Sequence, residues 1–420
     1  MGRSSGTDSG RSSGKNGAGD SRSSDGRTAL VIGGGIGGLA AAIALHRTGW
    51  QVTVLERSAV LEDAGAGISL AANGIRALEA LGLGEAVRRA AHPQYTGGTR
   101  TPDGRWLSRM DGAALERALG VPVTGIRRAQ LHRLLRQALP PHCLRTGVTG
   151  SPDSADADLV VAADGVRSAI RTRLFPDHPG PVYSGSTVLR AITAEPLALD
   201  TDFALTWGPG AEFGHIGLPD GRAEWHAVLA APAGVRHPDP VAFLGRRFAG
   251  WHEPTARLLA ATRPEDVLHH DVHELVTPLP SYALGRVALL GDAAHAMTPN
   301  LGQGACQALE DAVVLAAEVS AGPDVETALL RYDAVRRPRA QAVARTARLA
   351  GRMGHRLSHP LAVSLRNRAL RLAPSGATVR AILRHADWTP PRLPPAPCGA
   401  GGDGHSERSS TAGDSTQSAT

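Results

Sequence analysis

The chain has 420 residues, with 42% hydrophobic and 4% aromatic residues, and its 45 Lys or Arg against 39 Asp or Glu give a net charge of +6. This length allows two domains, or one large domain with an insertion. The basic residues are spread along the chain and aromatic residues are scarce, so we expect no nucleic-acid partner. Three distant cysteines exclude a disulfide framework and a zinc site. No apolar run is long enough for a membrane span, and the Ser/Gly/Arg-rich start lacks the apolar centre of a signal peptide, so we expect a cytoplasmic protein.

The first part of the chain predicts a disordered tail followed by a βαβ unit. Residues 1–27 are polar and of low complexity. A short buried strand at 29–33, a glycine turn, an alanine-rich helix at 36–48 and a second strand at 50–56 follow. Such a unit implies a parallel sheet with a right-handed crossover. Further helices are predicted within residues 74–90 and 128–139.

The second part of the chain changes its pattern twice. A buried strand is predicted at 157–165, and residues 181–282 then show short alternating runs between Pro-Gly and Asp-Gly turns, which is typical of an antiparallel sheet. Another buried strand is predicted at 286–295. Helices rich in Ala and Arg continue to about residue 385, and a second disordered tail is predicted at 389–420.

The first turn contains Gly33, Gly35 and Gly38 in the spacing GxGxxG. In a dinucleotide fingerprint, the first glycine makes the tight turn, the second lets the backbone approach a pyrophosphate, and the third lets the helix pack close to the strand. Glu56 ends the next strand, where a carboxylate can accept hydrogen bonds from a ribose. The motif therefore predicts a dinucleotide, either NAD or FAD. The alternative is a glycine-rich turn without a ligand, with Glu56 as a solvated strand end.

Two later stretches decide between the nucleotides, ADLVVAADGVRSAIR and ALLGDAAHAMTPNLGQGACQALEDA. Their characteristic residues are Asp164, Gly165, Ser168 and Arg171 in the first, and Gly291, Asp292, Pro299, Gly302 and Gly304 in the second. Together with the GxGxxG turn, they resemble the three motifs of the class A flavoprotein monooxygenases, the single-component FAD-dependent aromatic hydroxylases. The motifs stand in the family's order, and the resemblance covers about residues 28–350.

The resemblance implies an α/β fold. A Rossmann-like FAD-binding domain with a parallel sheet is discontinuous in the chain, a mostly antiparallel substrate domain is inserted into it, and helices follow at the C-terminal end. We expect the FAD-binding domain at residues 28–95, 126–180 and 283–355, the substrate domain at 96–125 and 181–282, and the C-terminal helices at 356–388.

The cofactor site is expected at the ends of the parallel strands. Asp292, at the end of a strand, can accept a hydrogen bond from a ribityl hydroxyl. The loop from Pro299 to Gly304 presents backbone N–H groups and opens a helix, whose dipole would stabilise negative charge on a reduced flavin ring. The alternative is a strand-to-helix turn with structural glycines and Asp292 as an N-cap. By resemblance, Glu56 binds the adenosine ribose, and further cofactor contacts come from Arg57, Ser69, Arg128 and Asp164.

The chain departs from the family between Arg128 and Asp164, where it is shorter than usual, so we expect a shortened turn in place of a hairpin near the adenine. On the substrate side, residues 207–234 resemble strands that carry substrate contacts. His226 and Trp225 are the catalytic candidates there, and a satisfied strand histidine and a core tryptophan are the alternatives. No second fingerprint for NAD(P)H is present, as in the family, which binds the nicotinamide transiently.

The resemblance therefore implies an FAD-dependent monooxygenase. It would use NAD(P)H and O2 to hydroxylate or epoxidise a small aromatic or polyketide-like substrate through a flavin hydroperoxide. Two alternatives stay open. One is a flavin-dependent dehydrogenase or other oxidoreductase of the same fold, and the other is a non-catalytic nucleotide-binding protein. A halogenase of this fold usually carries a catalytic lysine, and the only lysine here is Lys15, in the predicted tail.

Overall fold

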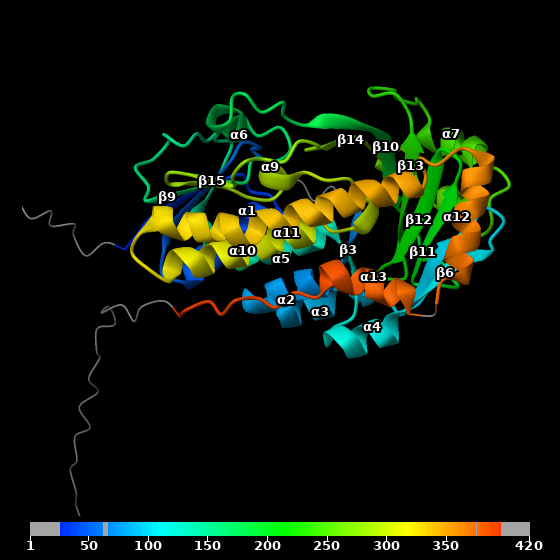
Figure 1. The fold of residues 1–420 in the computed structure, drawn as a ribbon, viewed down its shortest axis with the longest axis horizontal. Coiled ribbons are helices and arrows are strands. Elements are labelled where there is room, and N and C mark those ends of the chain that lie inside the picture. The colour runs from blue at the N-terminus through cyan, green and yellow to red at the C-terminus, as the bar shows by residue number, and fades with distance from the viewer. Residues whose placement is uncertain (1–25, 62–65, 375, 396–420) are drawn as a thin grey trace, which may run out of the picture.

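The computed structural model describes residues 26–61, 66–374 and 376–395 (Figure 1). Most of the two predicted tails lies outside these residues. Arg27, the last residue of the first predicted tail, donates hydrogen bonds to the carbonyls of Val319 and Gly322, both at 2.8 Å. In this described part of the chain, no helix is both long and apolar enough to cross a bilayer.

The first sheet contains the predicted βαβ unit and has six strands. Their order is β15 (Ala283–Leu284), β16 (Val287–Leu289), β9 (Leu159–Ala162), β1 (Thr28–Ile32), β2 (Gln51–Glu56) and β8 (Leu144–Thr146). All neighbours are parallel except β15, which is antiparallel to β16. The central strands are continuous apolar runs because helices cover both faces of such a sheet. The connection from β8 to β9 contains no further strand.

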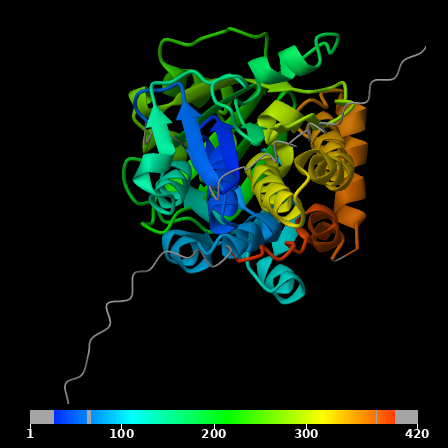
Figure 2. The ribbon, with the colours of Figure 1, turned by 90° about the vertical axis from the view of Figure 1, so that its left-hand side faces the viewer.

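Helices α1 (Ile36–Arg47) and α10 (Gly304–Ser320) pack against each other beside this sheet, as Figure 2 shows from the end at the left of Figure 1. Their approach is close, because a Cβ built on Gly37 would lie 3.1 Å from Cβ of Ala308 on α10. Gly49, with φ of 90°, follows α1 as predicted. Helices α5 (Arg128–Gln137) and α6 (Ala169–Leu174) complete this part.

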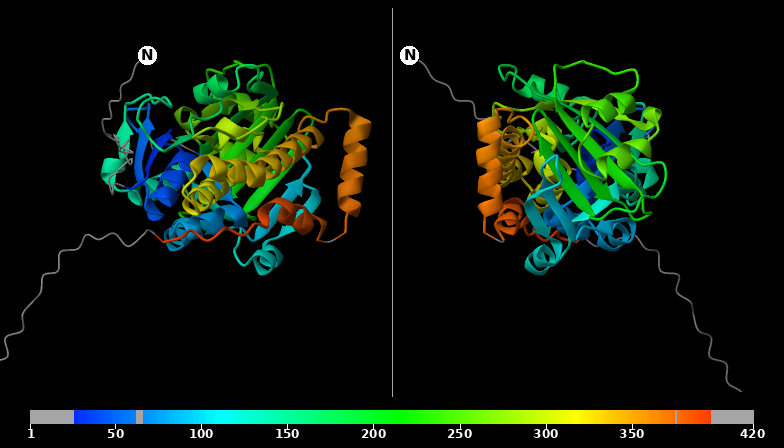
Figure 3. Two further views of the ribbon diagram at one scale, coloured as in Figure 1. Left: turned by 60° about the vertical axis from the view of Figure 1, so that its left-hand side comes forward. Right: turned by 90° about the vertical axis from the view of Figure 1, so that its right-hand side faces the viewer.

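The second sheet has seven strands and is mostly antiparallel, as predicted. Their order is β14 (Leu268–Glu274), β10 (Val182–Ile192), β13 (Ala223–Ala230), β12 (Ala211–Gly217), β11 (Phe203–Gly208), β5 (Thr96–Arg100) and β6 (Trp106–Asp111). Only β5 and β11 pair in parallel. The right-hand view of Figure 3 shows this sheet. Helices α7 (Pro240–Arg247) and α8 (Thr255–Ala260) pack on one side of it around Trp225, and we call this side the outer face.

The other side of the seven-stranded sheet, the inner face, meets the rest of the molecule. A small sheet of β3 (Gly67–Leu70), β7 (Thr124–Arg127) and β4 (His92–Pro93) adjoins it. A Cβ built on Gly67 would lie 2.8 Å from Cβ of Glu224, a residue of β13. The inner face therefore carries the alternate residues of β13, which include Glu224, His226 and Val228.

The remaining helices connect the two large sheets. They are α2 (Ala72–Ala80), α3 (Gly84–Ala90), α4 (Gly112–Leu119), α11 (Val325–Met353), α12 (Pro360–Leu372) and α13 (Ala377–Ala386), with 3-10 segments at Pro141–Cys143, Pro264–Asp266 and Pro299–Leu301. The 29-residue α11 runs from the six-stranded sheet toward the seven-stranded one (Figure 1). Helix α12 packs against β6, and α13 packs against α2 and α4.

Two predicted buried strands are shorter than expected. The strand predicted at 157–165 spans only Leu159–Ala162. The strand predicted at 286–295 ends at Leu289, and α9 (Asp292–His295) follows it directly. Gly291 separates the two elements with φ of 61° and ψ of −136°, a conformation that side chains disfavour. Asp292 therefore starts a helical turn and does not end a strand.

Candidate cofactor and substrate sites

The three glycines of the first turn meet different surroundings. Gly33 has φ of 111°, and a Cβ there would lie 2.2 Å from the carbonyl oxygen of Ala163. A Cβ on Gly38 would lie 1.9 Å from the carbonyl oxygen of Gly33. A Cβ on Gly35 would meet no atom within 4 Å. Two glycines are thus needed for the protein's own packing, whereas the middle one borders open space where a ligand can approach the backbone.

Glu56 lies beside this turn. Its carboxylate accepts hydrogen bonds from the backbone N–H of Gly34 at 2.7 Å and of Ser58 at 2.8 Å. The carbonyl of Gly34 lies 2.8 Å from Nε2 of His132, a contact that the sequence did not indicate. The side chain of the next residue, Arg57, is exposed. The carboxylate is therefore fixed at the start of α1.

The segment after β9 links the first turn to the region of α9. The carboxylate of Asp164 accepts a hydrogen bond from the N–H of Ile170 at 3.3 Å, while its Oδ1 is buried without a partner among the described residues. Ser168 caps α6 by accepting from the N–H of Arg171 at 2.9 Å. The buried Arg171 guanidinium donates to the carbonyl of Ala293 at 3.1 Å. This arginine therefore fixes the turn that carries Asp292.

Asp292 and Arg128 lie near each other. The side chain of Asp292 is accessible to solvent on one side, but burial by the surrounding protein raises the pKa of its carboxyl, an effect that His295 and Arg128 oppose. Burial and the neighbouring Arg190 lower the pKa of Arg128, while Asp292 raises it. The adjacent Arg127 forms an ion pair with Asp220. Arg128, the first residue of α5, is therefore the arginine that faces Asp292.

The second glycine turn leaves its ligand side open. Pro299–Leu301 forms a 3-10 turn, Gly302 has φ of 62°, and Gly304 starts α10. A Cβ built on Gly302 or on Gly304 would meet no atom within 4 Å. The start of α10 therefore offers backbone N–H groups and the positive end of a 17-residue helix to an accessible space. Ser69, on β3, pairs with Gly125 of β7, and its side chain is partly buried.

A buried ionic network at the start of α10 fixes the turn at Gly291. Asp311 accepts hydrogen bonds from the N–H of Gly291 at 2.9 Å and from Nε2 of His295 at 2.6 Å. Arg336, fully buried on α11, donates from Nε to Asp311 at 2.7 Å and also pairs with Glu310. Burial alone would raise the pKa of Asp311, but His295 and Arg336 together lower it to about 2. The carboxylate is therefore charged and keeps the turn in place.

The two catalytic candidates lie on opposite faces of β13. Trp225 is fully buried on the outer face, stacks on Phe213 and donates from Nε1 to Thr262 at 2.7 Å. This placement favours its interpretation as a core residue. His226 lies on the inner face, with Nδ1 3.3 Å from the carboxylate of Glu224. Burial lowers the pKa of His226, but the carboxylate of Glu224 outweighs this and the net shift is upward.

Several residues of this region were missed by the sequence reasoning. Arg190 of β10 stands directly opposite His226, and its buried Nε has no partner among the described residues. Its signal in the sequence is a single cation within the apolar run STVLRAI. Asp311 and Arg336 were also missed, although each is a charged residue at an otherwise apolar helix position.

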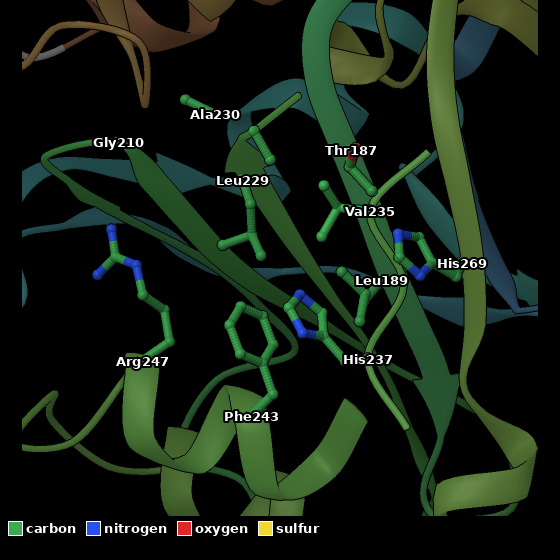
Figure 4. Close-up of a pocket in the computed structure, with 11 residues that line it drawn as sticks. Thr187, Leu189, Gly210, Leu229, Ala230, Val235, His237, Phe243, Arg247 and His269 are labelled. Carbon is green, nitrogen blue, oxygen red and sulfur yellow. The ribbon is translucent and has the colours of Figure 1, made fainter. Parts of the chain in front are cut away.

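A cavity of about 180 Å³ lies elsewhere, on the outer face (Figure 4). Leu189 and Leu229 form its floor, and Phe243, stacked on His237, stands with Arg247 beside it. None of the residues predicted for cofactor binding or catalysis lines it.

Comparison with known proteins identifies relatives of the whole folded part. The chain matches a family described as "FAD binding domain" over residues 27–143 and 142–347. It is 37% identical over 382 residues to an aurachin C monooxygenase/isomerase from Stigmatella aurantiaca, which covers 87% of this chain and 99% of the relative. It is 32% identical over 334 residues to an FAD-dependent urate hydroxylase from Klebsiella pneumoniae, over 73% of this chain and 85% of the relative.

Two solved structures also resemble this chain over most of its length. Klebsiella pneumoniae HpxO in complex with FAD and uric acid superimposes with a TM-score of 0.79 at 28% identity, covering 86% of this chain and 96% of that chain. A salicylate hydroxylase substrate complex superimposes with a TM-score of 0.65 at 25% identity, over 86% and 99% of the two chains.

Proposed function

Because this chain belongs to the FAD-binding-domain family and is an FAD-dependent monooxygenase of the class A type, we propose that its two glycine turns bind the two ends of one FAD. We further propose that O2 and NAD(P)H are its co-substrates, and that the molecule it oxygenates is a small aromatic or polyketide-like compound. When bound, FAD would supply the redox chemistry that activates oxygen with electrons from NAD(P)H.

The single observation that carries this proposal is the open space at both turns. Gly35 immediately precedes α1 and Gly304 is the first residue of α10, and a Cβ built on either glycine would meet no atom within 4 Å. In contrast, Gly33 and Gly38 are filled by the protein itself. At these two turns, room for a ligand therefore remains where the backbone N–H groups of a helix start can meet it.

Different residues around the turns would bind different parts of the cofactor. The carboxylate of Glu56, close to the first turn, would accept hydrogen bonds from the adenosine ribose, with Arg57 nearby. Arg128 and Asp292 would bind the phosphates and the ribityl chain between the turns. Pro299, Gly302 and Gly304 would border the flavin ring, and Ser69 and Asp164 would line its approach. A charged Asp311 supports this arrangement, because it holds the N–H of Gly291 in place.

The inner face of the seven-stranded sheet would provide the substrate wall. His226, paired with Glu224, is the side chain there that can exchange a proton with a substrate. Gly214, opposite His226 on β12, leaves room for its ring, because a Cβ there would lie 2.4 Å from Nε2.

The buried free thiols of Cys143 and Cys306 support a cytoplasmic location, where thiols stay reduced.

Asp292→Ala tests the proposal. We expect the purified variant to lose at least about tenfold in FAD affinity, since the carboxylate that would accept a hydrogen bond from the ribityl chain is lost. Asp153→Ala removes an exposed carboxylate and serves as the matched control. FAD content and NAD(P)H oxidation that both match the wild type would show that the proposed site is wrong. An oxygen electrode separates a monooxygenase, which consumes O2 with substrate, from a dehydrogenase, which does not.

A further inference from the structure

Helix α12 is attached to the rest of the protein through one of its sides. Arg366, on this side, is 7% exposed and donates hydrogen bonds to the carbonyls of Met353 at 2.7 Å and of Gly354 at 2.9 Å, where α11 ends. The same guanidinium lies 5.3 Å from the centre of the ring of Trp207, a residue of β11. In the left-hand view of Figure 3, the orange α12 stands at the edge of the molecule. The helix therefore has a fixed orientation, with its other side turned outward.

Three leucines lie on the outward side of α12. Leu361, Leu365 and Leu372 are 76%, 72% and 73% exposed. Because an α-helix makes one turn in about 3.6 residues, spacings of four and seven residues place these side chains in one row along the helix. We call them the leucine row. Exposed apolar side chains are usually scattered singly over a protein surface, so a row of three on one helix indicates a binding surface.

The part of the chain that carries the leucine row is positively charged. Residues 354–386 contain six arginines and no Asp or Glu. Four of these arginines are exposed and form no ion pair with another described residue, namely Arg368, Arg371, Arg380 and Arg384. Arg368 follows Leu365 by three residues and therefore stands within the leucine row. The outward side of α12 thus combines apolar side chains with unpaired positive charge.

The rest of the chain has no apolar segment left to cover the leucine row. Outside the described ranges 26–61, 66–374 and 376–395, the sequence contains no Leu, Ile, Val, Phe, Tyr or Trp. Removing exposed leucines from water requires an apolar partner of similar extent. The occupant of this surface must therefore come from outside the chain.

A second copy of the chain fits this surface poorly. In a twofold dimer the same patch of both copies meets, so Arg368 and Arg371 of one copy would face the same arginines of the other. No carboxylate within residues 354–386 could pair with them. An anionic lipid surface fits both features, because acyl chains accept leucine side chains and lipid phosphates accept hydrogen bonds from arginine.

We propose that α12 binds the surface of an anionic lipid bilayer, with the leucine row among the acyl chains and with Arg368 and Arg371 at the phosphate groups. The helix lies in the plane of the interface and does not cross the membrane. Because Arg366 ties α12 to Trp207 and the helix packs against β6, this contact holds the seven-stranded sheet close to the lipid. The inference goes beyond the proposed function and does not depend on how FAD or the substrate binds.

Sedimentation of the FAD-loaded full-length protein with lipid vesicles tests this proposal. One set of vesicles consists of phosphatidylcholine, and the other contains phosphatidylcholine and phosphatidylglycerol in equal parts. The protein should bind the anionic vesicles at least about tenfold more tightly, and high salt should remove this preference by screening the charges. The double variant Leu361→Ser and Leu365→Ser should weaken binding to the anionic vesicles at least about tenfold. The double variant Arg368→Gln and Arg371→Gln should reduce the preference for the anionic vesicles by at least about tenfold.

Leu330→Ser is the matched control for the leucine variants. Leu330 is 65% exposed on α11 but lies outside the leucine row, so its replacement should not change vesicle binding. All the replaced side chains are exposed, so each variant should keep the FAD content and the unfolding midpoint of the wild type.

Three results would overturn the proposal. The first is equal binding to the two kinds of vesicle, and the second is a leucine-row variant that binds as the wild type does. The third is a protein that binds neither kind of vesicle and forms a dimer in light scattering that the variants of Leu361 and Leu365 dissociate. That result would assign the leucine row to contact between two copies of the chain.

Discussion

The two glycine turns and the inner face of the seven-stranded sheet differ in how their buried polar groups are paired. Beneath the turns, the buried charges of Asp311, Arg336 and Glu310 pair with one another. On the inner face and beside it, Arg190, Thr298 and His355 keep buried polar atoms without partners among the described residues. The difference indicates that the charges of Asp311, Arg336 and Glu310 are satisfied within the protein, whereas these other polar groups require a ligand or water to satisfy them.

The largest effect should come from breaking the scaffold. Arg336→Met would leave the buried carboxylates of Asp311 and Glu310 without their cation, so we expect a loss of about 3–5 kcal/mol in the free energy of unfolding. Arg331→Met, on the same helix, removes an exposed partner of Glu318 and should cost less than about 1 kcal/mol. Chemical denaturation of both variants measures the difference. Equal losses would show that the network is not the support of the second turn.

A pair of glycine variants separates packing from ligand binding within one motif. Gly38→Ala places a Cβ 1.9 Å from a carbonyl oxygen, so we expect about 3 kcal/mol of destabilisation without FAD. Gly35→Ala meets no atom and should change the stability of the FAD-free protein by less than about 0.5 kcal/mol. It should nevertheless weaken FAD binding at least about tenfold. The idea fails if Gly35→Ala binds FAD as the wild type does.

The ionic network beneath the turns and the outer face of the seven-stranded sheet, where His215 stands opposite Trp225, should also respond to acid in different ranges. Burial lowers the pKa of His215, on β12, to about 4, so the unfolded chain, with a pKa of about 6.5, binds the proton first. The stability that neutral His215 contributes is therefore present above pH 6.5 and is lost as the pH drops toward 4. Between pH 6.5 and 5 the loss should be about 2 kcal/mol. The lowered pKa of Asp311, about 2, removes stability only below pH 4.

His215→Gln provides the check on this acid response. The glutamine side chain cannot titrate in this range. The free energy of unfolding of the variant should therefore fall by about 2 kcal/mol less than that of the wild type between pH 6.5 and 5. Parallel pH profiles of the two proteins would contradict the assignment.

The smallest effect should come from the outer face. Trp225→Phe removes the hydrogen bond to Thr262 and a little volume, and should cost about 1–2 kcal/mol in the free energy of unfolding. FAD affinity and turnover should not change. His226→Gln, on the inner face of the same strand, should lower turnover while leaving FAD affinity intact. Reversed results for the two variants would mean that the outer face is the substrate side.

The two glycine turns could be predicted from sequence because their signals are local. A glycine at a fixed offset after a strand, as at Gly33 and Gly302, indicates a turn whatever the rest of the chain does. The turn that carries Asp292 was predicted in this way, although the strand before it ended earlier than predicted. A small cavity beside the inner face could not be predicted, because His355, Ser186 and Asn300 come from three distant segments and meet only in the folded chain. The ion-pair partners of Arg336 could not be predicted from the sequence for the same reason.

A structure of the enzyme with FAD bound tests the central claim most directly. We predict that the pyrophosphate lies against the N–H groups next to Gly35 and that the isoalloxazine ring lies beside residues 299–304. A flavin ring bound at any other place, such as the cavity on the outer face, would contradict the claim that the two turns hold the ends of one nucleotide.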